Sequence, residues 1–170
     1  KQADEKVDDF NKKDITTFIN IGRHDEKQKK LSRIINAAKR LNKEGYKFRV
    51  VFVGKGVATK EYHNMARNIK NIEFLGAKKN PYPYLKNCNF YIQPSRYEGK
   101  AIAIDEALVL KKIIIATDFS TAKDQIIDGV NGFISEMKAE MLAKKIIDLI
   151  NNKEAIMKIE NHLIACDYDN

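Results

Sequence analysis

Residues 90–110 read F-Y-I-Q-P-S-R-Y-E-G-K-A-I-A-I-D-E-A-L-V-L and contain a complete strand, turn and helix pattern. The pattern predicts a short buried strand at 90–93, a turn containing Pro94, Ser95 and Gly99, and a helix from about Lys100 to Leu110. The helix is apolar on almost every side, which is typical of a helix enclosed by protein. We therefore expect this unit to lie at the centre of the domain, with its helix buried all round.

Three carboxylates interrupt the apolar stretch: Glu98 in the turn, and Asp105 and Glu106 inside the helix. A buried charge costs free energy unless it is paired or hydrogen-bonded. Between Glu98 and Glu106 lies a helix N-terminus behind Gly99, and helix N-termini attract anions. This arrangement suits a ligand with a central phosphate group and hydroxyl-rich parts on both sides. The spacing alone equally allows Glu98 to be a solvated loop acid and Glu106 an edge-of-core residue.

Strands and helices alternate along the rest of the chain. The expected strands, besides 90–93, are 17–21, 48–53, 72–75, 113–116 and 132–134. The expected helices are 31–41, 62–69, a short one ending near 87, 121–127, 139–150 and 153–166. Such alternation predicts an α/β fold with a doubly wound parallel sheet, which binds ligands at the carboxyl ends of its strands. Four candidate segments fall at that edge: 22–29, 54–56, 76–79 and 94–100.

Length and composition indicate one soluble α/β domain. The 170 residues carry a net charge of +8, mostly from scattered lysines. Without clusters of basic and aromatic residues, this charge indicates a solvated surface and no nucleic-acid partner, although it favours anionic ligands or an anionic membrane surface. Cys88 and Cys166 lack metal-ligand spacing, so we expect reduced thiols in a cytoplasmic protein. No apolar run approaches the length of a membrane span, no signal peptide is expected, and a first residue of Lys suggests an excised part of a longer protein.

The segment E-G-K-A-I-A-I-D-E-A at 98–107 resembles the E-x7-E segment of the retaining family-4 (group 1) glycosyltransferases, which use nucleotide-sugar donors on a GT-B fold. The resemblance implies that Glu98 holds hydroxyls of the donor sugar and Glu106 those of the ribose. The backbone groups that would meet the diphosphate belong to Gly99, Lys100, Ala101 and Ile102. The family usually has Gly-Phe-Gly after the first Glu, so the Gly-Lys-Ala found here leaves the donor sugar undefined.

The loop at 22–31, G-R-H-D-E-K-Q-K-K-L, resembles the family's G-R-…-K-G segment. The resemblance implies that Gly22 lies beside the donor and that Arg23 and Lys29 bind its diphosphate, with Lys30 in place of the usual glycine. Lys27 is the alternative if the loop is aligned the other way. Fixed cations stabilise the charge that develops on a leaving diphosphate, and arginine does so through a planar two-donor fork. Arg23, Lys29 and Glu98 are thus the implied catalytic residues.

Two further glycine-containing turns match the family. Gly54-Lys55-Gly56 corresponds to its glycine-rich turn near the donor phosphates, although a lone G-x-G is a weak signal and equally fits a plain strand-to-helix turn. N-I-E-F-L-G at 71–76 resembles V-x-F-L-G, after which backbone groups around Ala77 and Lys78 would receive the nucleobase, most commonly uridine.

The remaining candidate side chains give weaker signals. The three histidines show no ligand spacing, so no metal is expected. His24 alone falls near the site, where it could touch phosphate. Tyr82, Tyr84 and Tyr97 could cover a ligand, but core packing is the expected role for most of them.

The resemblance covers about residues 17–150. It implies a Rossmann-like nucleotide-sugar-binding domain at 15–152. The polar, mixed-charge composition of 1–14 predicts a linker or lead-in, and 153–170 are expected to form a C-terminal helix and tail. The implied activity is retaining sugar transfer from a UDP-linked donor, without metal or cofactor, to a sugar, glycan or lipid-linked acceptor held by a missing N-terminal domain. Bacterial surface polysaccharide or glycoconjugate synthesis at the inner membrane face would fit. Two alternatives stay open: a nucleotide-sugar epimerase, and a non-enzymatic nucleotide- or nucleic-acid-binding module.

Overall fold

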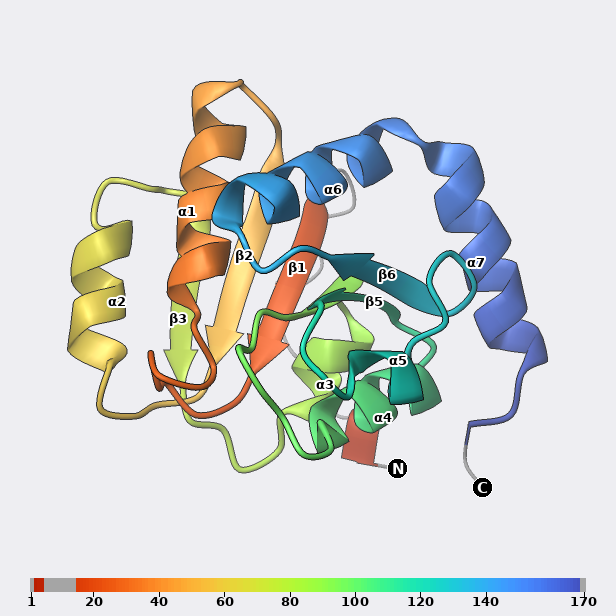
Figure 1. Ribbon diagram of the computed structural model, residues 1–170. Helices are drawn as coiled ribbons and strands as arrows, with labels where there is room; N and C mark the ends of the chain where they lie inside the picture. Colours follow the sequence, from red (N-terminus) through yellow and green to blue (C-terminus); the bar gives the residue numbers. More distant parts are fainter. Residues whose placement is uncertain (1, 5–14, 169–170) are drawn as a thin grey trace.

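The computed structural model describes residues 2–4 and 15–168, and it contains one parallel sheet of six strands (Figure 1). The strand order is β3-β2-β1-β4-β5-β6. The strands are β1 (Thr16–Ile21), β2 (Phe48–Val53), β3 (Ile72–Gly76), β4 (Phe90–Gln93), β5 (Ile113–Thr117) and β6 (Gly132–Ser135). The helices are α1 (Ser32–Lys43), α2 (Thr59–Ala66), α3 (Tyr82–Lys86), α4 (Ile102–Val109), α5 (Ala122–Gln125), α6 (Ala139–Asn151) and α7 (Lys153–Ala165). The predicted doubly wound α/β fold is confirmed.

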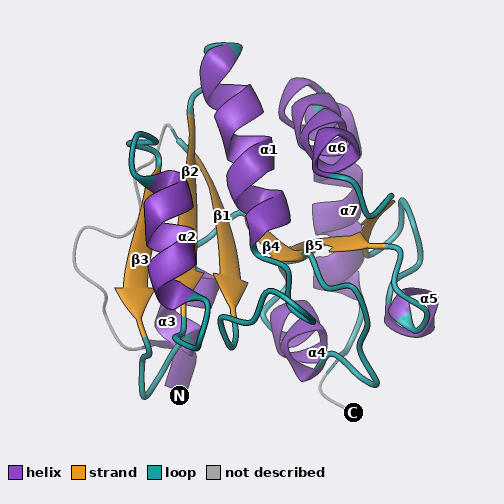
Figure 2. Ribbon diagram, turned by 60° about the vertical axis from the view of Figure 1, so that its left-hand side comes forward, coloured by secondary structure: helices purple, strands orange, loops and turns teal. Residues whose placement is uncertain are grey.

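Helices cover both faces of the sheet (Figure 2). Helices α1 and α2 lie on one face, with α6 packed beside α1, and α3 and α4 lie on the opposite face. The central strands are accordingly buried on both sides and mostly apolar: every residue of β5 is buried, and the Phe18 and Phe90 rings of β1 and β4 stack with centroids 5.1 Å apart. Continuous apolar strands are what a parallel sheet covered on both faces requires.

The strand order reverses between β1 and β4, and this reversal positions the loops that follow them. Chain connections run outward from β1 to β3 on one side and from β4 to β6 on the other, so the loops at 22–31 and 94–101 meet at the carboxyl edge. The backbone N–H of Arg96 donates to the carbonyl of Gln28 at 2.8 Å, which joins the two loops directly. Doubly wound folds bind ligands at such a switch point.

Helix α4 differs from its prediction in two ways. It begins at Ile102 rather than near Lys100, because the side chain of Gln125 hydrogen-bonds both backbone groups of Ala101 and holds that residue outside the helix. The expectation of burial on every side is wrong: Ile102 is 68% exposed, whereas Ile104 and Leu108 are buried. The first turn of α4 thus reaches the surface beside the 94–101 loop.

The two ends of the chain are only partly described. Gln2–Asp4 form a short 3-10 helix against α3, and the Asp4 carboxylate pairs with Lys86. Residues 1 and 5–14 of the expected lead-in and residues 169–170 of the expected tail lie outside the described residues. Helix α7 starts at a capping residue, since the Asn152 side chain accepts a hydrogen bond from the N–H of Ala155 at 3.0 Å. No helix in the described part of the chain has the length and apolar character needed to cross a membrane.

Candidate functional site

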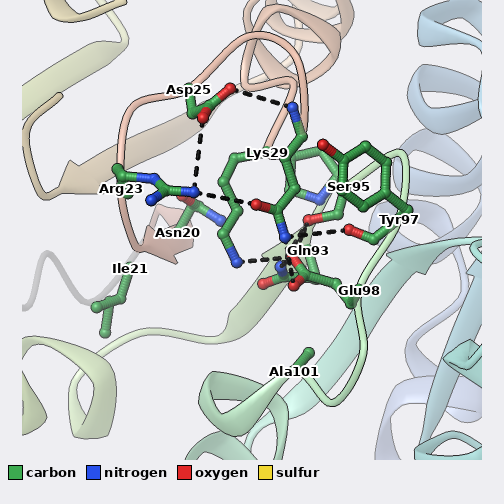
Figure 3. Close-up of polar contacts among 12 residues, drawn as sticks. Asn20, Ile21, Arg23, Asp25, Lys29, Gln93, Ser95, Tyr97, Glu98 and Ala101 are labelled. Atoms are coloured by element: carbon green, nitrogen blue, oxygen red, sulfur yellow. Dashed lines mark hydrogen bonds and ion pairs between the residues drawn. The ribbon is translucent and has the colours of Figure 1, made fainter. Parts of the chain in front are cut away.

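Glu98 is the buried centre of the carboxyl edge of the sheet (Figure 3). Only 8% of the residue is exposed. Its Oε1 accepts hydrogen bonds from Ser95 Oγ at 2.6 Å, Lys29 Nζ at 2.7 Å and Gln93 Nε2 at 2.9 Å, and its Oε2 accepts from Gln28 Nε2 at 3.1 Å. Glu98 is therefore not a solvated loop acid. Four donors fix the carboxylate in one place, and one of them is a cation.

The turn that carries Glu98 is held by Arg33, which lies on α1. The Arg33 guanidinium donates to the carbonyls of Pro94 at 2.7 Å and Ser95 at 3.1 Å, and Thr117 Oγ1 donates to the Ser95 carbonyl at 2.6 Å. Burial, together with nearby Arg96, lowers the pKa of Arg33 below its ordinary value. Hydrogen bonds between side chains and backbone thus give the turn the rigidity that a binding site needs.

Arg23 and Lys29 face this turn from the loop after β1 (Figure 3). The side chain of Arg23 is 62% exposed and donates to Gln28 Oε1 at 3.0 Å, with Asp25 Oδ2 at 3.5 Å. Because Gln28 also donates to Glu98, it links the exposed arginine to the buried carboxylate. The structure therefore brings together the three residues implied for catalysis, although none of these contacts tests their roles.

The same loop distinguishes the two candidate lysines. Lys29 contacts Glu98, whereas Lys27 is exposed at the loop surface. Lys30 has φ = +53°, the left-handed conformation in which glycine is favoured. This conformation fits the alignment that puts Lys30 at the family's glycine. The geometry favours Lys29 over Lys27 as the phosphate-binding lysine, and the binding itself stays a prediction.

A partly buried network of hydrogen bonds and one ion pair holds the loop against α2. Glu26 accepts hydrogen bonds from Tyr62 Oη at 2.9 Å and Ser32 Oγ at 2.6 Å, and Lys30 Nζ lies 2.7 Å from the same carboxylate. Burial and the Glu26 carboxylate raise the pKa of Tyr62 well above its ordinary value, so its hydroxyl stays protonated and can donate. Helix α2, through Tyr62, thus fixes the loop that carries Lys29.

His24 is a core residue and does not face the site. It is 1% exposed, and Nδ1 lies 2.9 Å from Thr59 Oγ1. Three aromatic rings surround it: Phe52, Tyr62 and Phe74. Within the described residues, its Nε2 has no hydrogen-bond partner. Burial, with a contribution from His63, lowers the pKa of His24. The expectation that His24 could touch phosphate is wrong, because the ring packs under α2.

The start of α4 faces open space. A Cβ atom built on Gly99 would meet nothing within 4 Å, and Ile102 is 68% exposed. The first N–H groups of a helix have no i−4 partner within it, although that of Ile104 donates to the Ala101 carbonyl at 2.8 Å. The Ala101 N–H differs, because it donates to Gln125 Oε1 at 3.1 Å. The Lys100 ammonium lies 2.8 Å from Asp105. Of the expected diphosphate contacts, Gly99 and Ile102 are open, whereas the Ala101 N–H is already used by Gln125.

The part of the site that is expected to bind the nucleoside is more exposed than Glu98. Glu106 lies one turn inside α4 and accepts a hydrogen bond from Tyr82 Oη at 2.8 Å, which raises the pKa of Tyr82. Tyr82 is thus a partner of a site carboxylate, whereas packing was the expected role for most of the tyrosines. Ala77 is exposed just after β3, and the neighbouring Lys78 Nζ lies 5.7 Å from the centre of the Tyr84 ring.

The Gly54-Lys55-Gly56 turn has a packing role. A Cβ atom on Gly54 would lie 1.8 Å from the carbonyl oxygen of Gly22, and Gly54 has φ = +147°. A Cβ atom on Gly56 would lie 2.3 Å from the carbonyl oxygen of His24. These glycines allow the loops after β1 and β2 to touch. Gly22 differs, since a Cβ atom there would meet nothing within 4 Å.

Several supporting residues gave no motif in the sequence: Gln28, Arg33, Gln93, Ser95 and Gln125. The sequence did offer one clue to Gln93, because this polar residue ends a buried strand at the ligand-binding edge of the sheet. No group of three or more potential metal ligands occurs among the residues that the structure describes. Burial raises the pKa of the Cys88 thiol to about 12, which makes it unreactive.

The family model for glycosyl transferases group 1 matches residues 1–163, so the chain belongs to this family. Its sheet is that of the C-terminal, Rossmann-like domain of GT-B glycosyltransferases. The expected family and fold class are therefore both confirmed.

The relatives agree with this assignment. The chain is 32% identical to an uncharacterized glycosyltransferase of Methanocaldococcus jannaschii, over 75% of this chain and 36% of the relative. It is 26% identical to the capsular polysaccharide biosynthesis glycosyltransferase CapM of Staphylococcus aureus, over 75% of this chain and 35% of the relative. The crystal structure of Anabaena HepE in complex with UDP superposes with a TM-score of 0.80 at 20% identity, over 89% of this chain and 43% of that chain. The chain thus spans about a third of the length of these curated relatives.

Proposed function

We propose that this domain binds a UDP-linked sugar at the carboxyl edge of its sheet, for retaining transfer of the sugar to an acceptor. The observation that carries the proposal is the buried Glu98 carboxylate facing Lys29 and Arg23 across the switch point. A diphosphate needs fixed cations, and a sugar needs a fixed hydrogen-bond acceptor for its hydroxyls. The similar fold of HepE, whose structures hold UDP and UDP-glucose, supports the same reading.

Each residue has a distinct role in this proposal. Arg23, Lys29 and the open N–H groups at Gly99 and Ile102 would bind the diphosphate and stabilise the negative charge that develops as the sugar–oxygen bond breaks. Glu98 would accept hydrogen bonds from the sugar hydroxyls. The acceptor oxygen would attack on the face from which the diphosphate leaves, so the protein need supply neither a nucleophile nor a metal ion.

On the nucleoside side, Glu106 would accept the ribose hydroxyls, and backbone groups near Ala77 would receive the base. The Glu106–Tyr82 hydrogen bond would orient that carboxylate.

The acceptor would be a sugar, glycan or lipid-linked sugar held by a further N-terminal domain. The chain alone would then bind the donor and transfer little. The likeness to CapM, a capsular polysaccharide biosynthesis glycosyltransferase, supports a role in surface polysaccharide synthesis. The whole protein would then act in the cytoplasm near the membrane.

Calorimetric titration with UDP, GDP, UDP-glucose and GDP-mannose, in the presence of EDTA, tests the proposal. We expect UDP and UDP-glucose to bind, and Arg23→Gln and Glu106→Gln to weaken binding at least about ten-fold. The matched controls Arg40→Gln and Glu44→Gln remove an exposed ion pair of α1, with N–O distance 2.7 Å, and should leave binding unchanged. Absence of nucleotide binding, or salt-sensitive binding of a nucleic acid that UDP does not compete with, would contradict the proposal.

A further inference from the structure

The Lys29–Glu98 ion pair is the most buried charge contact at the site. Lys29 Nζ lies 2.7 Å from Glu98 Oε1, and the two side chains are 23% and 6% exposed. Removing the cation from a buried carboxylate is costly, because the remaining charge loses its compensation. Any ligand that draws Lys29 away from Glu98 must therefore offset that cost.

The two partners of the pair are held by different numbers of contacts. Glu98 keeps three neutral hydrogen-bond donors, from Ser95, Gln93 and Gln28, whatever Lys29 does. The turn after β4, which Arg33 and Thr117 hold in place, fixes the position of the Glu98 carboxylate. Within the described residues Lys29 has one ion-pair partner, Glu98, and its side chain is a flexible four-carbon arm. When a third group competes for the pair, the ammonium moves and the carboxylate stays.

We propose that this ion pair makes the domain select an intact nucleotide sugar over the free nucleoside diphosphate, an inference that rests on the proposed function. A diphosphate that binds Lys29 draws the ammonium away from Glu98 and leaves the buried carboxylate without its cation. This separation costs free energy. The hydroxyls of a donor sugar offset this cost by donating to Glu98, whereas a free nucleoside diphosphate leaves the carboxylate without that compensation.

The same pair favours release of the product. Once the sugar has left, Glu98 loses its hydroxyl donors and a free diphosphate with additional negative charge remains beside Lys29. Glu98 then competes again for the ammonium, which weakens the contact between the protein and the diphosphate. The carboxylate that holds the donor sugar thus raises the dissociation rate of the spent nucleotide.

Titration of the chain and its Glu98→Gln variant with UDP and UDP-glucose tests the inference. The wild-type chain should bind UDP-glucose more tightly than UDP. Glu98→Gln should tighten UDP about ten-fold and weaken UDP-glucose, so that the preference reverses. Glu98→Ala should also tighten UDP binding, so the test remains valid if the glutamine variant does not fold. The control Glu44→Gln removes one exposed ion-paired carboxylate and should change neither affinity.

A double-mutant cycle tests whether Glu98 affects UDP binding through Lys29. If freeing Lys29 causes the gain, Glu98→Gln should tighten UDP by no more than about two-fold in a Lys29→Met background. UDP affinity that is unchanged or weakened in both folded Glu98 variants would overturn the inference while leaving the proposed function standing. A full gain in the Lys29→Met background would overturn the role of the pair. Binding of neither nucleotide by the wild-type chain would overturn the proposed function and this inference together.

Discussion

The turns after β2 and β4 lie at the same edge of the sheet, and both contain glycine, but their glycines have different uses. At Gly54 the missing Cβ is required by the chain itself, because the carbonyl oxygen of Gly22 occupies that space. At Gly99 the space is open. The first glycine lets two loops pack, and the second leaves backbone N–H groups accessible at the start of a helix. The sequence motif is similar in both places, so only the three-dimensional neighbours reveal which glycine serves the fold.

The largest expected effect comes from filling the packed turn. Gly54→Ala should lower the free energy of unfolding by about 3 kcal/mol or more, since it combines a backbone clash with a φ of +147° that other residues rarely adopt. Urea unfolding followed by circular dichroism measures this. If the free energy of unfolding falls by less than about 0.5 kcal/mol, the two loops can separate freely. The proposed difference between the Gly54 and Gly99 turns would then be wrong.

Filling the open turn should affect binding and not stability. Gly99→Ala should leave the free energy of unfolding within about 0.5 kcal/mol of the wild type. It should weaken UDP binding about ten-fold, because a methyl group would keep the diphosphate from the backbone. Calorimetry on the folded variant provides the comparison. Unchanged affinity would mean that the ligand does not approach this turn.

Lowering the pH should reduce the free energy of unfolding through His24, which hydrogen-bonds Thr59 next to the Gly54–Gly56 turn. Burial lowers the pKa of His24 in the folded chain, so below the ordinary value of 6.5 the unfolded chain binds a proton that the folded chain does not. Stability should therefore fall as the pH drops from 6.5 to the folded-state pKa, by at most about 1.4 kcal/mol per pH unit, and this contribution should then level off.

Unfolding titrations between neutral and acidic pH measure this slope. His24→Gln should flatten it, whereas the control His162→Gln should retain it. Equal slopes in both variants would show that His24 is not the group responsible.

The smallest expected effect concerns the cationic loop. Lys30→Gly should raise the free energy of unfolding by roughly 0.5 kcal/mol, because glycine relieves the left-handed strain at φ = +53° while losing the contact with Glu26. Lys30→Ala keeps the strain and loses the contact, so it should destabilise the chain. Thermal unfolding of the two variants decides whether the conformation or the charge matters more at this position.

Most of the fold could be predicted from the sequence, because apolar periodicity and the turn residues after each strand determine it. The strands 48–53 and 90–93 were predicted with the bounds that the structure shows. The exposure of Ile102 could not be predicted, since a helix without a polar face gives no sign of which side meets solvent. The bounds of α2 also shifted, as the helix begins at Thr59.

The site was predictable only in part. Family motifs pointed to Glu98, Arg23 and Lys29, but their roles stay predictions. The residues that hold them could not be found from local patterns, because Arg33 and Gln28 act on a turn more than sixty positions away along the chain. Contacts of that kind are created by the sheet order, which brings the loops after β1 and β4 together.

The most direct test of the account is a titration of the isotope-labelled chain with UDP, followed by backbone amide chemical shifts. The account predicts that the largest changes occur at the two loops of the switch point, at Gly22, Gly99 and Ile102. Gly45, at the opposite edge of the sheet, should not change. Saturable changes confined to other surfaces, with the Gly99 and Ile102 amides unmoved, would contradict the claim that this edge binds the nucleotide.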